Sequence, residues 1–262
     1  MPYHHVIFDT ALGVNAAFTE LVPAIDPYMP RNGNSRIKPE KPLQLLGAYY
    51  HAASATRARI VTPSYTSLGN FNIMPLSRSL LPDDVPAVNW FDPGRVTLPA
   101  NEEIIVQGSN NLGAATERSF CHLFLSFGQF QFGSTPARII PVLCNYTITS
   151  VANQWTGPGV LTFPVTLATG RYRVWGMHVV DANVVAARLI FGSLGGDQLQ
   201  LLRPGVPVCQ AAGDYPDPKF RGGLGEWGNF RSDIPPQIEI YANNAAAHTG
   251  DVWLYLSYEP GN

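Results

Sequence analysis

The chain has 262 residues, and 45% of them are apolar, which is enough to bury the core of one large domain or of two domains of about 130 residues. Only 14% are charged, against roughly 25% in an average globular domain, so we expect much of the surface to be buried against other chains. The net charge of −2 carries no basic signature of nucleic-acid binding, and no acidic tail is present.

Along the chain, short runs rich in β-branched and aromatic residues alternate with turn residues, among them 24 Gly and 23 Pro. The runs predict strands over residues 57–62, 103–107, 122–127, 159–166, 171–180, 237–242 and 252–258. Helical periodicity is limited to one or two turns near residues 15–21 and 77–81. Many short strands at roughly regular spacing indicate an all-β fold of the sandwich or barrel class.

The first 35 residues contain four prolines and an Asn-Gly-Asn turn at residues 32–34. We predict that residues 1–35 form an extended arm that contributes strands to the first domain and is ordered by a neighbouring subunit. No secretory signal and no apolar run of 18 residues is visible, so the chain is expected to be made in a cytoplasm and not to span a membrane. Cys121, Cys144 and Cys209 share no metal-ligand spacing, which predicts buried, reduced thiols.

Two halves of the sequence are similar when one is shifted by 129 residues. Between residues 47 and 75 this shift gives six identities in 29 positions, where about two are expected from average usage. The identical pairs are Gly47/Gly176, Ala53/Ala182, Ala58/Ala187, Arg59/Arg188, Ser64/Ser193 and Pro75/Pro204. With small further shifts, Trp90 matches Trp227, and the run ending at Phe127 matches the run ending at Tyr258. The pattern predicts an internal duplication, with a first domain over residues 36–133 and a second over residues 134–262.

Charged residues at matching places in the two halves are candidates for structural or interface contacts. Arg59 and Arg188 each lie within an apolar run, which favours a satisfied ion pair, an interface contact or a solubilising charge on an edge strand. Glu103 and Glu239 follow in the same order in each half. We expect these carboxylates to have a structural role and to pair with the two arginines.

Tryptophans form a second group of candidates. Trp90 and Trp227 match each other beside Gly and Pro, which favours hydrophobic plugs under a loop over a ligand shelf. Trp155, which precedes Thr-Gly-Pro, is the best candidate for an exposed ring. Exposed rings of this kind can line a carbohydrate platform, so the residue keeps that alternative open.

The sequence supports no catalytic residue, cofactor site or metal site. It lacks a Gly-x-Ser-x-Gly elbow, a P-loop and a dinucleotide fingerprint. His4 and His5 are neighbours on an expected strand, so their side chains should point apart, which disfavours joint metal ligation. The same argument separates Cys121 from His122 as a nucleophile and base. We therefore expect a protein that is not an enzyme.

The tandem sandwich-like halves, the low charge and the absence of a visible active site resemble the double jelly-roll major capsid proteins of tailless icosahedral viruses, of the bacteriophage type. The resemblance covers nearly the whole chain and implies two tandem jelly-roll β-sandwiches related by internal duplication. It implies a homotrimer with pseudo-hexagonal outline that assembles with itself and with other capsid proteins into an icosahedral virion. No specific nucleic-acid site is visible, and contact with an internal membrane stays an open alternative that no sequence feature supports.

Two other classes of protein fit the same features. A phage decoration, fibre or receptor-binding protein is also β-rich and trimeric, and exposed aromatic loop tips would favour it. A carbohydrate-binding β-sandwich would need a platform of exposed rings. Strong burial on several sides would favour the coat subunit.

Overall fold

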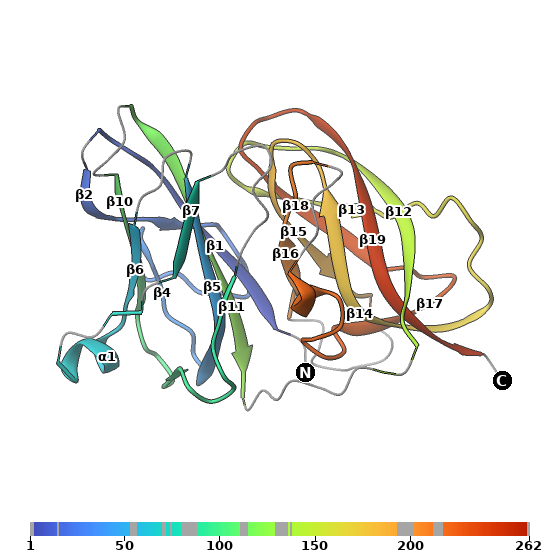
Figure 1. Ribbon diagram of the computed structural model, residues 1–262, viewed down its shortest axis with the longest axis horizontal. Helices are drawn as coiled ribbons and strands as arrows, with labels where there is room; N and C mark the ends of the chain where they lie inside the picture. The colour runs from blue at the N-terminus through green and yellow to red at the C-terminus, as the bar shows by residue number, and fades with distance from the viewer. Residues whose placement is uncertain are drawn as a thin grey trace. The chain divides into compact units, whose positions relative to one another are not determined.

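The computed structural model describes residues 3–14, 16–52, 57–69, 72–73, 75–79, 88–110, 115–128, 136, 138–192, 202–211 and 217–260. Within these ranges the fold is all-β, with one short α-helix and one short 3₁₀ helix (Figure 1). The chain divides into two compact units, which we call the first sandwich (residues 6–130) and the second sandwich (residues 1–5 and 131–262). The domain boundary predicted between residues 133 and 134 lies outside the described residues.

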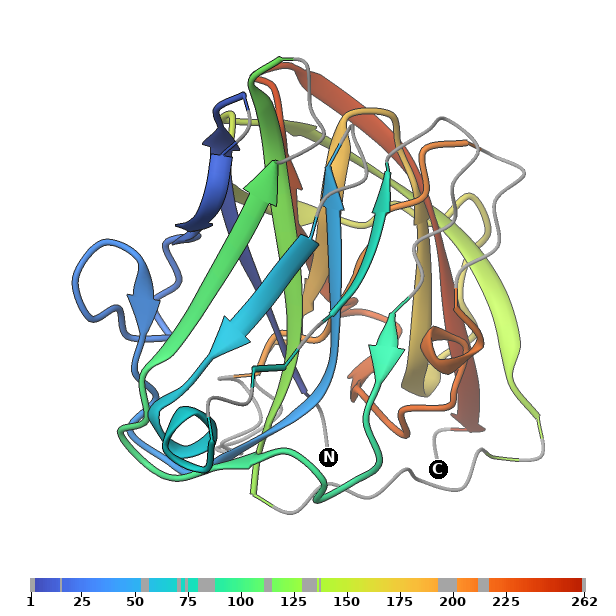
Figure 2. The same ribbon diagram turned by 60° about the vertical axis from the view of Figure 1, so that its left-hand side comes forward.

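The first sandwich contains strands β1 to β11, of which β1 begins with two residues of the second sandwich. The elements are β1 (His4–Leu12), β2 (Ala16–Glu20), β3 (Val22–Pro23), β4 (Arg36–Ile37), β5 (Leu43–Ala52), β6 (Arg57–Val61), α1 (Pro63–Ser67), β7 (Leu76–Ser79), β8 (Asn89–Trp90), β9 (Thr97–Leu98), β10 (Ile104–Asn110) and β11 (Glu117–Phe127). One sheet has the order β3-β1-β11-β5-β7, with β8 and β9 also pairing with β5. In the other sheet β10 pairs with β2, β4 and β6, and the β6–β10 pair is visible in cyan and green in Figure 2.

The second sandwich consists of two four-stranded sheets. Its elements are β12 (Ile140–Thr149), β13 (Trp155–Val160), β14 (Gly170–Val180), β15 (Val184–Ile190), β16 (Gly205–Pro207), η2 (Pro218–Phe220), β17 (Gly228–Arg231), β18 (Gln237–Ala242) and β19 (Ala247–Pro260). The sheet orders are β12-β19-β14-β17 and β13-β18-β15-β16. Every ladder in these two sheets is antiparallel.

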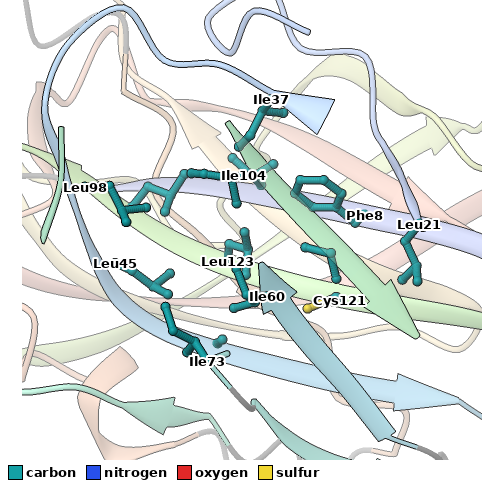
Figure 3. Close-up of a cluster of buried hydrophobic side chains, with 14 of the residues drawn as sticks. Phe8, Leu21, Ile37, Leu45, Ile60, Ile73, Leu98, Ile104, Cys121 and Leu123 are labelled. Carbon is teal, nitrogen blue, oxygen red and sulfur yellow. The ribbon is translucent and has the colours of Figure 1, made fainter. Parts of the chain in front are cut away.

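Apolar side chains at alternate strand positions form the core of each sandwich. In the first sandwich, Phe8, Ile60, Ile104 and Leu123 come from both sheets and point toward one another (Figure 3). In the second sandwich, β19 alternates between exposed and buried residues and places Val252, Leu254 and Leu256 inside. This period of two is what a strand with one covered face requires. Burial of these side chains supplies the main favourable term in folding.

Some strands are buried along their whole length and lack this alternation. All ten residues of β5 are buried, including the polar Gln44 and His51. In β15 only the last residue, Ile190, is more than marginally exposed. Strands with this pattern have both faces covered, and their apolar sequences agree with that environment.

Most of the predicted strands are confirmed, and three expectations about secondary structure are wrong. The segments expected to form helical turns near residues 15–21 and 77–81 contain β2 and β7 instead, whose residues pair with β10 and β5. The strand expected over residues 159–166 ends at Val160. Thr162 then exchanges backbone hydrogen bonds with Asn145 of β12, so the chain has left the sheet that contains β13.

Two further features of the described residues concern the cysteines and membrane spans. Cys121, Cys144 and Cys209 are all buried, as the sequence predicts. Among the residues that the structure describes, no helix has the length and apolar character needed to cross a membrane.

Candidate functional site

The best-defined polar site of the second sandwich is built around Arg188 at the centre of β15. Arg188 lies opposite Glu239 of β18, and its Nε donates a 2.6 Å hydrogen bond to Oε2 of that carboxylate. The guanidinium lies over the ring of Trp155, 4.0 Å from the ring centroid. Arg188 is 1% exposed and Glu239 is 8% exposed. A charge at this depth needs both the ion pair and the hydrogen bond, and the cation–π contact adds to them.

A second arginine shares the same carboxylate. Arg203, which precedes β16, donates from one terminal nitrogen to Oε1 of Glu239. Each carboxylate oxygen of Glu239 therefore accepts from a different arginine. Among the described residues, this one carboxylate thus joins the two guanidiniums.

The first three described residues, Tyr3, His4 and His5, complete this site, and we call them the 3–5 segment. The Tyr3 hydroxyl donates to the Gly205 carbonyl at 2.6 Å, and the His5 amide donates to the Arg203 carbonyl at 3.1 Å. The Arg203 amide donates to Nδ1 of His4 at 3.2 Å. All three side chains of the segment are fully buried. The segment therefore lies beside the edge strand β16, joined to residues 203–205 by these three hydrogen bonds.

The surroundings of His5 favour its neutral form. Burial, the nearby Arg188 guanidinium and His4 together hold the pKa of His5 well below its usual 6.5. Its ring also packs edge-on against Trp155, with centroids 6.0 Å apart. An imidazolium at this place would sit beside the Arg188 guanidinium with little access to water, so His5 is held in its neutral form.

The first sandwich carries a counterpart of the arginine site. Arg59 of β6 lies opposite Gln107 of β10, and its Nε donates to Oε1 of that amide at 2.8 Å. Its guanidinium lies 4.2 Å from the centroid of the Phe18 ring on β2. These three side chains are only partly buried. Both predicted arginines thus make one hydrogen bond across the ladder and one contact with an aromatic ring. The acceptor of Arg188 is a charged carboxylate, and the acceptor of Arg59 is a neutral amide.

The predicted pairing of glutamates with arginines holds in one half only. Glu239 pairs with Arg188, but Glu103 pairs with Arg36 at 2.9 Å and also accepts from Asn32. The hydrogen bond from Arg36 holds the pKa of Glu103 below its usual value. The strand register places Gln107, not Glu103, opposite Arg59, so Glu103 and Glu239 do not occupy equivalent places.

The three candidate tryptophans have different environments. Trp227 is 1% exposed and packs edge-on against Tyr3 and Phe220, so it is a buried plug. Trp90 is partly buried on β8, opposite Gly47 and beside Phe124. Trp155, expected to present an exposed ring, is partly buried and has the Arg188 guanidinium over one face.

Two groups of buried polar residues escaped the sequence analysis. His51 of β5 and His122 of β11 have their Nε2 atoms 3.2 Å apart, so one ring donates to the other, and both are almost fully buried. Burial lowers the pKa of His51 to about 3. In the second sandwich, Asp181 accepts from the Tyr146 hydroxyl at 2.7 Å and lies 3.3 Å from Nδ1 of His248. Their separations of 35 to 71 residues along the chain left no spacing signal.

The described residues offer contacts for holding chain segments in place, and no set of groups arranged for a reaction. Within these ranges, no three His, Cys, Asp or Glu side chains converge as metal ligands would. The fold and these sites define an all-β protein of the β-sandwich class. No protein-family model matches the sequence, and no curated protein matches it significantly.

Proposed function

We propose that this protein is a structural coat subunit that self-assembles, as a homotrimer, into an icosahedral virion. The observation that carries the proposal is the shared strand order of the two sandwiches. The order β1-β11-β5-β8 in the first has the counterpart β12-β19-β14-β17 in the second. The order β2-β10-β6 has the counterpart β13-β18-β15. These orders fit two tandem jelly rolls that arose by duplication, each with sheets of four strand positions.

Irregular details that recur in both sandwiches support the duplication. In the β5–β11 ladder one residue, Leu46, is bulged out immediately before Gly47, and in the β14–β19 ladder Trp175 is bulged out immediately before Gly176. A bulge re-aims the strand locally and is retained in related structures as a specific feature. Its recurrence next to a matching glycine favours common descent of the two halves over chance similarity of two β domains.

A second pair of details concerns how the chain crosses between sheets. The amide of Ile60 donates to the carbonyl of Ile73, and the amide of Leu189 donates to the carbonyl of Pro204. Further along the chain, each sandwich has a parallel contact with its other sheet. In the first sandwich β7 pairs in parallel with β5, and this ladder includes His51. In the second sandwich the parallel bridge joins Val180 to Cys209. Parallel pairing is uncommon in antiparallel sandwiches, so this shared crossing adds to the case for two equivalent units.

Exposed apolar side chains supply surfaces on which copies could associate. On the edge strand β12, Ile140 is 43% and Leu143 is 37% exposed. Elsewhere Ile25, Leu68 and Val160 are each more than 60% exposed. Together with the 14% content of charged residues, these side chains favour a subunit that buries surface on assembly over a free monomer.

Assembly of the purified protein, observed by negative-stain electron microscopy, tests the proposal. We expect closed shells or uniform trimeric particles, and we expect Ile140→Glu to reduce their number without lowering the thermal stability of the subunit. Dispersed monomers at every protein concentration would contradict the coat function. A glycan-binding screen of the same sample would then test the carbohydrate-binding alternative.

A further inference from the structure

The 3–5 segment docks on the second sandwich in the manner of an added strand. Three hydrogen bonds join it to residues 203–205, each to a backbone group of those residues, and the one from the His5 amide is backbone to backbone. Main-chain hydrogen bonds of this kind give affinity in strand addition, and pockets for side chains give specificity. The segment thus makes the contacts of a bound peptide, although it belongs to the chain.

Two aromatic contacts anchor the segment. The Tyr3 ring packs edge-on against Trp227, with centroids 5.3 Å apart and planes at 88°. The His5 ring packs against Trp155 on the other side. Buried aromatic anchors of this kind carry most of the binding energy of an interface.

A glycine makes room for the segment at the sheet edge. A Cβ atom on Gly205 would lie 2.8 Å from Nδ1 of His5 and would overlap the Ala187 carbonyl oxygen. No side chain larger than hydrogen therefore fits between the imidazole and β15 at this register. The glycine is thus required by the packing of β15 as well as by the segment.

The segment and its docking surface are far apart in the sequence, and His4 and His5 also begin strand β1, which continues into the first sandwich. Residues 1–5 group with the second sandwich, whereas the chain from Val6 onward belongs to the first. We propose that residues 203–205, with Trp155, Arg188 and Trp227 beside them, form a docking site for the 3–5 segment of a second copy of this chain. The inference rests on the proposed assembly, because assembly brings a second copy within reach.

The charges around the site make docking dependent on pH. Nδ1 of His4 accepts a hydrogen bond from the Arg203 amide, so this nitrogen must be unprotonated in the docked segment. His5 faces His4 on its own segment and Arg188 from β15. In the described part of the site, the carboxylate of Glu239 already accepts from Arg188 and from Arg203. Protonation of either imidazole therefore opposes docking.

Linkage gives the sign of this effect. A free segment has histidines near their usual pKa of 6.5, and docking requires the neutral rings. Below about pH 6.5 docking must release protons, so affinity falls by up to about tenfold per pH unit for each imidazole. Above about pH 7.5 affinity becomes independent of pH.

A labelled peptide of residues 1–6 tests the site on the full chain. In Tyr3→Ala protein the anchor of the resident segment is lost and the docking surface is intact. We expect the peptide to bind this variant at least about tenfold more tightly than it binds the unmodified protein, by fluorescence anisotropy at about pH 7.5. A peptide with alanine in place of tyrosine should bind at least about tenfold more weakly, and lowering the pH to about 5.5 should weaken the unmodified peptide by a similar factor.

Equal affinity for the two proteins, or no binding to either, would refute the docking site. His5→Ala provides a second receptor if Tyr3→Ala does not fold, as judged by circular dichroism. Exchange between copies is tested with a photo-crosslinking residue at position 3 of the assembled protein. A product of twice the chain mass supports exchange, and a product of single-chain mass alone rejects it. If particles form but the peptide does not bind, the docking site is rejected and the coat function stands. If the peptide binds a protein that stays monomeric, the coat function is rejected.

Discussion

Arg59 and Arg188 make the same pair of contacts in the two sandwiches. Each guanidinium lies over an aromatic ring. The distance from its Cζ atom to the ring centroid is 4.2 Å for Arg59 over Phe18 and 4.0 Å for Arg188 over Trp155. Each Nε donates across the ladder to the side chain directly opposite. The two sites differ in the charge of the acceptor and in burial, because the first uses an amide near the surface and the second a carboxylate in the interior.

Replacing the buried carboxylate should therefore be far more destabilising than replacing its neutral counterpart. Glu239→Gln removes the buried carboxylate that both Arg188 and Arg203 contact and should lower the free energy of unfolding by about 3–5 kcal/mol. The matched change Gln107→Ala removes one partly exposed hydrogen bond and should lower it by about 1 kcal/mol. Urea denaturation followed by tryptophan fluorescence measures both. Losses of equal size would mean that the buried cluster is not needed for stability.

The two bulge-associated glycines should differ in their tolerance of a methyl group. A Cβ atom on Gly176 would overlap the backbone carbonyl of Phe220, whereas on Gly47 it would lie 2.7 Å from the end of the Trp90 side chain. Gly176→Ala should therefore lower the free energy of unfolding by about 3 kcal/mol, and Gly47→Ala by about 1 kcal/mol, because a side chain can shift more easily than the backbone. Thermal and urea denaturation of both variants would show the order. The reverse order would contradict the proposed packing of η2 against β14.

The buried pair His51 and His122 predicts a loss of stability in acid. Burial lowers the pKa of His51 from 6.5 to about 3, so the unfolded chain binds a proton at this residue between these values and the folded chain does not. Stability is then full above about pH 6.5 and falls as the pH drops toward about 3. Between about pH 7 and pH 5 the loss should be about 2 kcal/mol.

His51→Leu provides the control for this pH dependence. The variant should be less stable at about pH 7.5, because His122 loses its hydrogen-bond partner, but its stability should change by about 2 kcal/mol less than that of the unmodified protein between about pH 7 and pH 5. Denaturation curves over a pH series measure both slopes. Identical slopes would assign the acid sensitivity to other groups.

The cysteines should be unreactive until the protein unfolds. Cys121 and Cys209 are about as buried as Cys144, and burial raises the pKa of the Cys144 thiol to about 12 and that of Cys121 further. The thiolate is the reactive form, so a thiol reagent should label fewer than one cysteine per native chain and all three in urea. Rapid labelling of the native protein would show that one of these sites opens to solvent.

The sequence predicts the fold class and one of the two arginine pairings, for identifiable reasons. Strand runs such as the one that forms β19 combine alternation with turn residues at their ends, and these signals are local. The Arg188–Glu239 pair followed from charged residues within apolar runs. The partner of Arg59 was wrong because the shift between the halves changes from 129 residues at Arg59 to 132 at Gln107, so one fixed offset cannot align both strands.

The contacts of the 3–5 segment could not be predicted from the sequence. Tyr3 and Gly205 are 202 residues apart, and neither belongs to a motif that links them. The sequence disfavoured joint metal ligation by the two histidines beside Tyr3 and favoured a solvated or hydrogen-bonded pair, but it did not identify their neighbours Arg203 and Trp155, which only the folded chain brings near. Contacts of this kind depend on topology, and no local pattern predicts them.

The mass of the purified protein in solution, determined by light scattering, tests the central claim most directly. Assembly as a coat subunit predicts a stable particle of three times 28.6 kDa, or a much larger closed shell, over a wide range of protein concentrations. A particle of 28.6 kDa that does not associate at any concentration would contradict the proposed function.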